Sequence, residues 1–420
     1  MKRALPIFFL FFSSCFLFED EQNTKLSLSL HSAGVTTVNL NVSPEDSLVE
    51  FTFELTRDDS IVQSLSIQSD TIIKDIGLNP NTSYTYKGYW MNGTERIGES
   101  ETLTITTMDT TSHNLTWEVD TLGEYGSILH DAVVVNENNI WVVGRIITDS
   151  NNYNAAHWDG EEWKYIKVME PGGWTPYVKC VYYFAEDNIW FGRGGLPVKW
   201  NGEEFYIFTP ANGEHPGQPS IDAIWGSSPD DIYFVGMEGS IVHYNGTIFE
   251  RVATWLPEID LMSVSGNEDG SAVFITGWNL WGDGKSMVVE IINGEVNILF
   301  HSVTNYMGIS GHVSSVDVFG DTAYFATNDS FWKYNYKTKE SFFIDEDIAQ
   351  MTGLDFYPII VQNSNDIIMI GSGGYAAHFN GSNWIRDSSL FHFTRYGGDF
   401  NNNYIVVVGA YSRVGRGHRQ

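Results

Sequence analysis

Short apolar runs alternate with small and polar residues at a regular interval along the C-terminal three quarters of the chain. The clearest copy spans residues 224–244, IWGSSPDDIYFVGMEGSIVHY, and Asn245-Gly246 follow it directly. One apolar run ends in glycine, a small-residue link follows, and a second run ends in an Asn-Gly turn. The run-ending glycine recurs in six copies and is replaced by alanine in one: Gly144, Gly192, Gly236, Gly277, Gly371 and Gly409, with Ala326. The interval averages about 44 residues, which marks a repeat architecture.

The runs are short and rich in β-branched and aromatic residues, which favours strands. No long stretch places apolar residues at the three-to-four spacing of a helix, so the chain is predicted to be all-β. A strand repeat of this length is typical of a β-propeller blade with four strands. In the third copy, these strands are predicted at residues 220–225, 232–235, 241–244 and 249–253.

The last copy is incomplete and predicts how the ring closes. Residues 404–409 supply a second strand and residues 412–418 a third, but the sequence ends at Gln420 without a fourth. Residues 115–120 resemble the fourth strands around Trp163 and Trp384 in other copies. We therefore predict a propeller over residues 112–420 that is closed by strand 115–120, which removes exposed sheet edges. Seven blades are predicted; the fifth copy lacks both glycines and leaves six or eight open.

Residues 25–108 do not follow the repeat and show alternating strands of their own. The strands are predicted at residues 25–30, 36–42, 49–55, 63–68, 84–90 and 101–107. The segment with Leu78, Pro80, Thr82 and Tyr84 resembles the E–F corner of a fibronectin type III domain. The resemblance implies an Ig-like β-sandwich in which the Tyr84 hydroxyl bonds to upstream backbone and residues 91–100 form a loop.

The N-terminus has the pattern of a targeting segment. Lys2-Arg3 precede an apolar stretch, residues 4–12, which is too short for a comfortable membrane span. The stretch ends in Phe-Ser-Ser-Cys and resembles a bacterial lipoprotein signal. This resemblance implies lipidation of Cys15, a tether at residues 16–24, and attachment to a membrane of the bacterial cell envelope, facing periplasm or exterior. The alternative is an ordinary secretory signal and a secreted protein.

Charge and motifs exclude several classes of function. The net charge is −30, with 53 acidic against 23 basic residues, and no basic stripe suits a nucleic acid. Motifs for calcium, zinc, nucleotide phosphates or a serine nucleophile are absent, so we predict no cofactor, no metal and no catalytic set. His157, His243 and His378 share one position on third strands, with Trp200 in another copy. This recurrence indicates packing or a strand–turn hydrogen bond.

Two segments of the third copy carry a second resemblance. Residues 225–231 and 239–246 resemble propeller repeats of bacterial secreted proteins and lipoproteins. More distantly they are similar to sialidase-type and photosystem-assembly-factor repeats. The resemblance implies the fold and leaves the activity open, because one fold hosts many functions.

The candidate site lies where second-to-third and fourth-to-first connections gather, which we call the loop-rich face. Aromatic rings beside carboxylates and arginines suit sugar stacking or a protein hot spot. The candidate ligand-binding residues are Arg145, Trp174, Arg193, Glu238, Trp255, Trp278, Trp281, Asp283, Tyr306 and Arg395. We predict a non-catalytic lipoprotein that binds a glycan or a protein. The alternative is an extracellular polysaccharide hydrolase or lyase with Glu238 and Asp283 as general acid and base.

Overall fold

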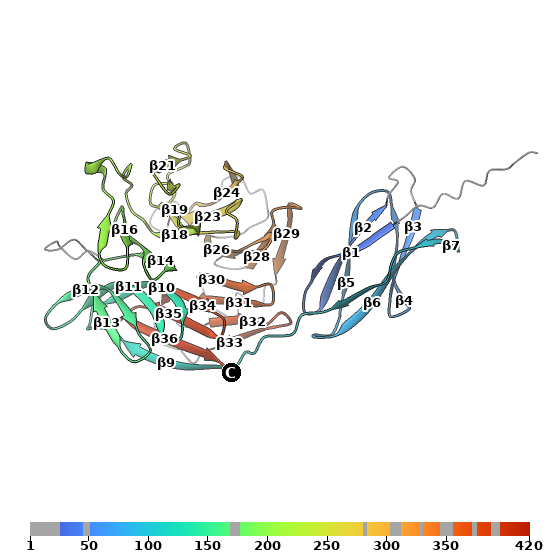
Figure 1. Cartoon of the computed structure of the whole chain (residues 1–420), viewed down its shortest axis with the longest axis horizontal. Coiled ribbons are helices and arrows are strands. Elements are labelled where there is room, and N and C mark those ends of the chain that lie inside the picture. Colours follow the sequence, from blue (N-terminus) through green and yellow to red (C-terminus); the bar gives the residue numbers. More distant parts are fainter. Residues whose placement is uncertain are drawn as a thin grey trace, which may run out of the picture. The chain divides into compact units, whose positions relative to one another are not determined.

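The computed structural model describes residues 26–44, 51–168, 177–279, 284–302, 312–327, 331–344, 356–371, 376–387 and 395–420. The chain divides into two compact units, Met1–Met108 and Asp109–Gln420 (Figure 1). Apart from one short 3-10 helix, η1 (Pro210–Asn212), the regular elements of the described residues are strands. The all-β prediction is therefore confirmed. No helix in these ranges is long and apolar enough to cross a membrane.

The first unit contains two antiparallel sheets. A three-stranded sheet has the order β1-β2-β5, and a five-stranded sheet has the order β4-β3-β6-β7 with β8 beside β6. Their strands are β1 (Leu26–Ala33), β2 (Thr37–Pro44), β3 (Phe51–Arg57), β4 (Ser60–Ile67), β5 (Thr71–Ile76), β6 (Ser83–Asn92), β7 (Glu95–Glu99) and β8 (Leu103–Thr106). Side chains of both sheets, among them Leu40, Phe53 and Tyr86, pack into one hydrophobic cluster. Alternation along each strand sends these residues to one buried face.

The corner around Tyr84 has the contact that its motif predicts. The Tyr84 hydroxyl accepts a hydrogen bond from the backbone N–H of Asn79 at 2.8 Å. This bond holds the turn where the chain enters β6. It also gives the Asn79 N–H, a backbone donor of the turn, a hydrogen-bond partner.

Two strands of the first unit were missing from the prediction. Strand β7 lies in the segment expected to be a loop and pairs with β6 in a hairpin. Strand β5 was missed because its alternation contains a buried charge. Asp75 is 8% exposed, forms an ion pair with Arg57 at 2.8 Å and accepts a hydrogen bond from the Tyr86 hydroxyl at 2.8 Å. A carboxylate that is paired can point into the core at a position where the polarity of the sequence predicts a solvent-exposed side chain.

The second unit contains seven four-stranded antiparallel sheets within the described residues. The first four sheets comprise β10 (Ile128–Asn136), β11 (Asn139–Ile147), β12 (Asn152–Trp158), β13 (Trp163–Ile166); β14 (Cys180–Ala185), β15 (Asn188–Arg193), β16 (Leu196–Trp200), β17 (Phe205–Ile207); β18 (Ala223–Ser228), β19 (Asp231–Gly236), β20 (Ser240–Tyr244), β21 (Phe249–Val252); and β22 (Leu261–Gly266), β23 (Ala272–Trp278), β24 (Ser286–Ile292), β25 (Glu295–His301). The remaining sheets comprise β26 (Val313–Phe319), β27 (Thr322–Thr327), β28 (Phe331–Asn335), β29 (Glu340–Ile344); β30 (Phe356–Asn363), β31 (Asp366–Gly371), β32 (Ala376–Phe379), β33 (Trp384–Asp387); and β34 (Arg395–Asn401), β35 (Tyr404–Gly409), β36 (Arg413–Arg419), β9 (Leu115–Thr121).

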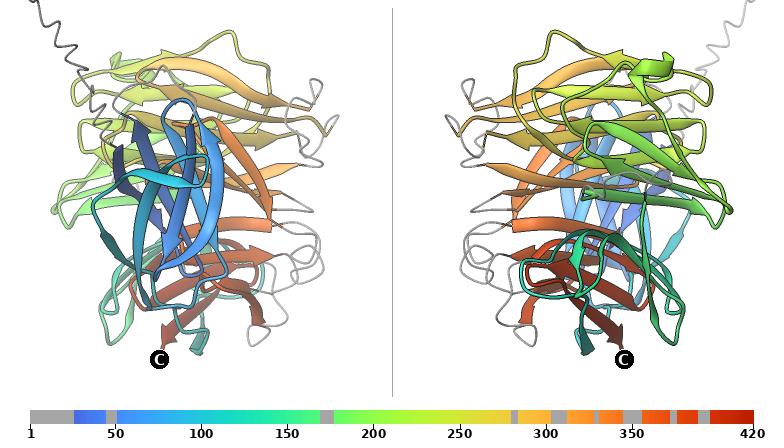
Figure 2. Two further views of the ribbon diagram at one scale, coloured as in Figure 1. Left: turned by 90° about the vertical axis from the view of Figure 1, so that its right-hand side faces the viewer. Right: turned by 90° about the vertical axis from the view of Figure 1, so that its left-hand side faces the viewer.

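These sheets are arranged around a common centre. The first strand of each sheet contacts the first strand of the next, and β34 of the last sheet contacts β10 of the first. Figure 1 shows first strands such as β10, β14 and β30 near the centre and fourth strands such as β13 and β33 at the rim. Figure 2 shows the strands running across the thickness of the ring, so the connections gather at its two ends. This is the arrangement of a β-propeller.

The last sheet combines the two ends of the second unit. Strand β9 pairs with β36 in a register that places Leu115 opposite Arg419 and Thr121 opposite Arg413. The indole N–H of Trp117 on β9 donates to the Asp387 carboxylate of the neighbouring sheet at 2.6 Å. Pairing of β9 leaves β36 without a free edge in this sheet.

At three of the run-ending glycines, the backbone at the start of the first strand crosses closely. A Cβ atom at Gly236 would lie 2.0 Å from the Ser220 carbonyl oxygen. At Gly144 and Gly277, it would lie 2.2 and 2.1 Å from the equivalent carbonyls of Ile128 and Asp260. The glycine therefore marks where the second strand passes under the segment that leads into the first strand.

Aromatic residues at one repeated position fill the space between sheets. Trp141, Trp190 and Tyr233 are 8%, 0% and 8% exposed. Trp190 is surrounded by rings of the next sheet, including Phe234 at 5.6 Å and Tyr244 at 5.4 Å between centroids. The prediction that these residues serve packing is confirmed.

The repeated histidines make the predicted strand–turn hydrogen bonds. The Nε2 atoms of these histidines lie 2.6–3.0 Å from side-chain oxygens at the start of the second strand, in the pairs His157–Asn139, His243–Asp231 and His378–Asp366. The assignment of Trp200 to this position was wrong by one residue. Lys199 lies opposite Trp190, as His243 lies opposite Tyr233. The connection between second and third strands is one residue shorter in this sheet, which shifts the third strand in sequence.

Candidate functional site

A pocket of about 360 Å³ opens on the loop-rich face at the centre of the ring. Its walls come from the first strands, or the residues that adjoin them, of all the sheets in the second unit. Its polar and aromatic lining includes His130, Asp131, Lys179, Asp222 and Tyr396. We call it the axial pocket. First strands of all the sheets meet around this centre, so the pocket gathers residues far apart in sequence.

The His130 side chain of this pocket contacts two tyrosine rings. Its ring lies between Tyr177 and Tyr396, with centroid distances of 5.6 and 6.0 Å. The tyrosines are 46% and 43% exposed, and the His130 side chain makes no hydrogen bond to the described residues. Burial, followed by the nearby Lys179 ammonium, lowers the pKa of His130 to about 4. The imidazole is therefore neutral at pH 7 and offers one donor and one acceptor.

The cation in this pocket is already neutralised. Lys179 forms an ion pair with Asp222, and the Ser220 hydroxyl also donates to that carboxylate. Both charged side chains are mostly buried, with 21% and 15% of their area exposed. A pair held in this way contributes little net field, so the axial pocket favours a polar ligand without a strong charge of its own.

Three aspartates on the first strands around the centre of the ring have a structural role. Asp131, Asp317 and Asp399 each accept the backbone N–H of a residue on the first strand of the next sheet: Val181 at 3.0 Å, Val361 at 2.7 Å and Val134 at 2.7 Å. First strands of neighbouring sheets have no ladder between them, and these carboxylates pair donors that would otherwise be orphaned. Burial raises the pKa of Asp131 to about 7 and that of Asp317 to about 6, although the N–H donors act in the opposite direction.

The raised pKa of Asp131 predicts a pH dependence of stability. Its stabilising contribution is complete below the ordinary pKa of 3.8 and is lost as the pH rises towards about 7. Asp131→Asn removes this titration and keeps one side-chain oxygen as an acceptor. We expect the unfolding free energy of the wild type, relative to Asp131→Asn, to fall between pH 4 and pH 7 in urea titrations. A constant difference for Asp131→Asn would contradict the expectation.

The structure places five of the predicted site residues on described connections and strand ends. Arg145 is exposed and donates to the Gly126 carbonyl at 2.6 Å. Glu238 is exposed at a left-handed φ of 59°, and Trp255 is 61% exposed. Arg193 is half-buried at the end of β15. Trp278 is 7% exposed and stacks on His312 at 4.2 Å, which is the position of a ring that caps the core.

Other predictions fall outside the described part of the chain. These are Cys15, Trp174, Trp281, Asp283 and Tyr306. Arg395 begins β34, and only its backbone is described.

None of the described candidates lines the axial pocket, whereas the sequence analysis missed His130, Lys179 and Asp222. The sequence does carry a signal for these missed residues. Several first strands begin with a polar residue, ahead of the alternating apolar positions. In the described residues no group of three or more histidine, cysteine, aspartate or glutamate side chains could hold a metal ion.

Comparisons with known proteins show the fold. No family model matches the chain, and no curated protein matches its sequence. A catalytically inactive virginiamycin B lyase from Staphylococcus aureus, with quinupristin, has a TM-score of 0.56 and 12% identity over 73% of this chain and 100% of that chain. YCF48 bound to D1 peptide has a TM-score of 0.55 and 12% identity over 74% and 100%. YCF48 from Cyanidioschyzon merolae has a TM-score of 0.52 and 16% identity over 72% and 98%. The chain is thus a distant structural relative of known β-propellers.

Proposed function

We propose that this chain is a cell-envelope lipoprotein and a non-catalytic binding module. Its second unit is a seven-bladed propeller that recognises a glycan or a protein at the axial pocket of the loop-rich face. Its first unit is an Ig-like, fibronectin type III-like sandwich that acts as a stalk or a second surface. The cyclic contacts of seven first strands support the blade count, and the Tyr84 corner with its two-sheet core supports the sandwich.

The observation that carries the binding proposal is the surroundings of His130. A neutral imidazole between two half-exposed tyrosines combines flat apolar faces with one donor and one acceptor. Tyrosine and histidine rings of this kind stack on sugar faces or on side chains of a partner, and their polar atoms orient the ligand. The fold does not choose between binding and catalysis, because solved propellers include a peptide-bound protein and a lyase.

The experiment probes a glycan array and a protein array with the chain from residue 25 onward. The double variant Tyr177→Ala/Tyr396→Ala should raise the dissociation constant of a hit by about tenfold or more, because paired aromatic anchors carry much of the energy of such contacts. Tyr165→Ala is the matched control, since Tyr165 is 39% exposed on β13 at the rim. Equal losses in both variants, or a hit that is indifferent to both, would place binding elsewhere.

A second candidate is an extracellular hydrolase or lyase that acts on polysaccharide. It is favoured by two titratable neighbours in one pocket, His130 with a pKa of about 4 and Asp131 with a pKa of about 7. Against it, Asp131 accepts a backbone N–H of the next sheet just as Asp317 and Asp399 do, which indicates a structural carboxylate. Turnover of a glycan panel that is abolished by His130→Ala or by Glu238→Gln would establish catalysis and displace the binding proposal.

The anchor has its own test. We expect mass spectrometry of the mature protein from its native host to show an acylated Cys15 as the first residue. An intact N-terminus, or cleavage at another position, would leave a secreted or differently anchored protein.

A further inference from the structure

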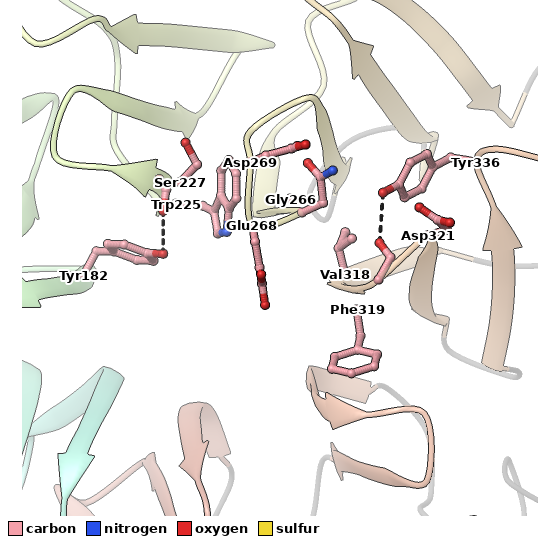
Figure 3. Close-up of a pocket in the computed structure, with 13 residues that line it drawn as sticks. Tyr182, Trp225, Ser227, Gly266, Glu268, Asp269, Val318, Phe319, Asp321 and Tyr336 are labelled. Atoms are coloured by element: carbon pink, nitrogen blue, oxygen red, sulfur yellow. Dashed lines mark hydrogen bonds between the residues drawn. The ribbon is translucent and has the colours of Figure 1, made fainter. Parts of the chain in front are cut away.

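A second cavity lies at the opposite end of the ring from the axial pocket. It has a volume of about 670 Å³ and forms between the turns β18–β19, β22–β23 and β26–β27 of three consecutive sheets (Figure 3). We call it the turn-face pocket. The side chains that matter for its chemistry are Trp225, Glu268, Asp269, Phe319, Asp321 and Tyr336. The proposed function above makes no use of this end of the ring.

The floor of this pocket carries an indole donor that has no partner among the described residues. Trp225 is 9% exposed, and its indole N–H makes no hydrogen bond to the residues that the structure describes. Figure 3 shows the indole nitrogen on the side of the ring that faces the open pocket. Because the indole nitrogen itself reaches the open pocket, water can pair it in the free protein. A ligand that brings an acceptor, such as a carbonyl oxygen, would take the place of that water.

Glycine keeps this floor open. A Cβ atom at Gly266 would lie 2.5 Å from the Trp225 ring, so any larger residue there would displace the indole. At the mouth of the pocket, the Phe319 side chain is 40% exposed. In Figure 3, Phe319 and Glu268 both project into the open space from different turns. The pocket therefore combines apolar ring surface with charge.

The charge of the pocket has a single sign. Glu268, Asp269 and Asp321 are exposed carboxylates, and no lysine, arginine or histidine lines the cavity. Asp269 accepts a hydrogen bond from the Ser271 N–H at 2.9 Å, whereas Glu268 accepts none from the described residues. Lys337 lies beside this pocket, with its ammonium 5.4 Å from the centroid of the Tyr336 ring. A concave wall of one sign concentrates ligands of the opposite sign.

We propose that the turn-face pocket binds a basic side chain, preferably arginine, from an extended segment of a partner polypeptide. The guanidinium would donate to the carboxylates of Glu268 and Asp321, while its stem lies against Phe319. The Trp225 N–H would donate to a backbone carbonyl of the same segment. Arginine fits better than lysine because its planar fork donates to two carboxylates at once and stacks on aromatic faces. A peptide supplies both the cation and the acceptor that the pocket lacks.

The test uses the whole chain from residue 25 and a capped Gly-Arg-Gly tripeptide amide, with the citrulline tripeptide as a neutral match. Binding is followed by the 15N-indole resonance of Trp225, assigned with Trp225→Phe. We expect the arginine peptide to shift this resonance and to bind about tenfold more tightly than the citrulline peptide. Affinity for the arginine peptide should fall as salt rises, because the contacts are partly exposed.

Two double variants distinguish an effect of this pocket from an effect of the overall charge of the protein. Glu268→Gln/Asp321→Asn should weaken the arginine peptide by about tenfold. Glu203→Gln/Glu204→Gln removes the same charge from the exposed β16–β17 turn and should change affinity less than about twofold. Equal affinity for the two peptides, or equal losses in the two variants, would overturn the proposal. So would a neutral oligosaccharide that shifts Trp225 when the arginine peptide does not. Failure of this test would not count against binding at the axial pocket, because that proposal is tested with different variants and different ligands.

Discussion

Replacing Trp190 with alanine should lower the unfolding free energy of the second unit by about 3–5 kcal/mol. Trp190 is fully buried between the second and third sheets and contacts four rings: Phe208, Phe234, Tyr244 and Phe249. Its indole N–H also donates to Asn188 at 2.9 Å. Alanine would leave a cavity that the strands on either side cannot close, because they are held by their own ladders.

The measurement is urea unfolding followed by far-ultraviolet circular dichroism. Trp255→Ala is the matched control, because Trp255 is 61% exposed and its loss should change the free energy by no more than about 0.5 kcal/mol. If the two tryptophan variants lost the same stability, the packing of neighbouring sheets around Trp190 would not be the source of the effect.

Replacing Arg419 with alanine should cost about 3–5 kcal/mol, because it leaves a buried carboxylate without its partner. Arg419 is 7% exposed on β36, and its two Nη atoms donate to the Asp366 carboxylate of the neighbouring sheet at 2.5 and 2.7 Å. Burial alone would raise the pKa of Asp366, but hydrogen bonds from His378 and Arg419 hold this pKa below its ordinary value. The carboxylate is therefore charged and depends on these donors.

This ion pair joins the last sheet, in which β36 pairs with β9, to the neighbouring sheet that contains β31. Its loss should therefore also destabilise β9 and β36. We expect faster hydrogen exchange in β9 and β36 of Arg419→Ala than in strands far from the closure, such as β19. Arg251→Ala is the control, since Arg251 is exposed on β21. A loss below about 1 kcal/mol for Arg419→Ala, the range of an exposed pair, would show that the pair is solvated.

The repeat and the strands were readable because their signals are local. The strand that ends in Gly236 is recognised by its alternating apolar positions, and the Asn245-Gly246 turn by its need for backbone freedom. Each of these signals involves only a few neighbouring residues. The recurrence of Trp141, Trp190 and Tyr233 likewise indicated a packed position without knowledge of the neighbours. Where the local signal was ambiguous, as for the buried Asp75 on β5, the strand was missed.

The site was not readable in the same way. Trp278 looked like an exposed ligand contact in the sequence, and only the structure shows its ring stacked on His312. His130 meets Tyr177 and Tyr396 because three different sheets bring their first strands to one centre. No spacing in the sequence encodes that meeting.

By itself, the sequence determined the all-β class, the repeat and the buried aromatic position, because each follows from short-range alternation and turn chemistry. Only the tertiary structure decided which polar groups converge, as in the axial pocket around His130 and the turn-face pocket around Trp225. It also decided that Asp131, Asp317 and Asp399 link neighbouring sheets. The physical reason is that radial packing sets the distances between residues from different repeats, and these distances depend on every sheet in the ring at once.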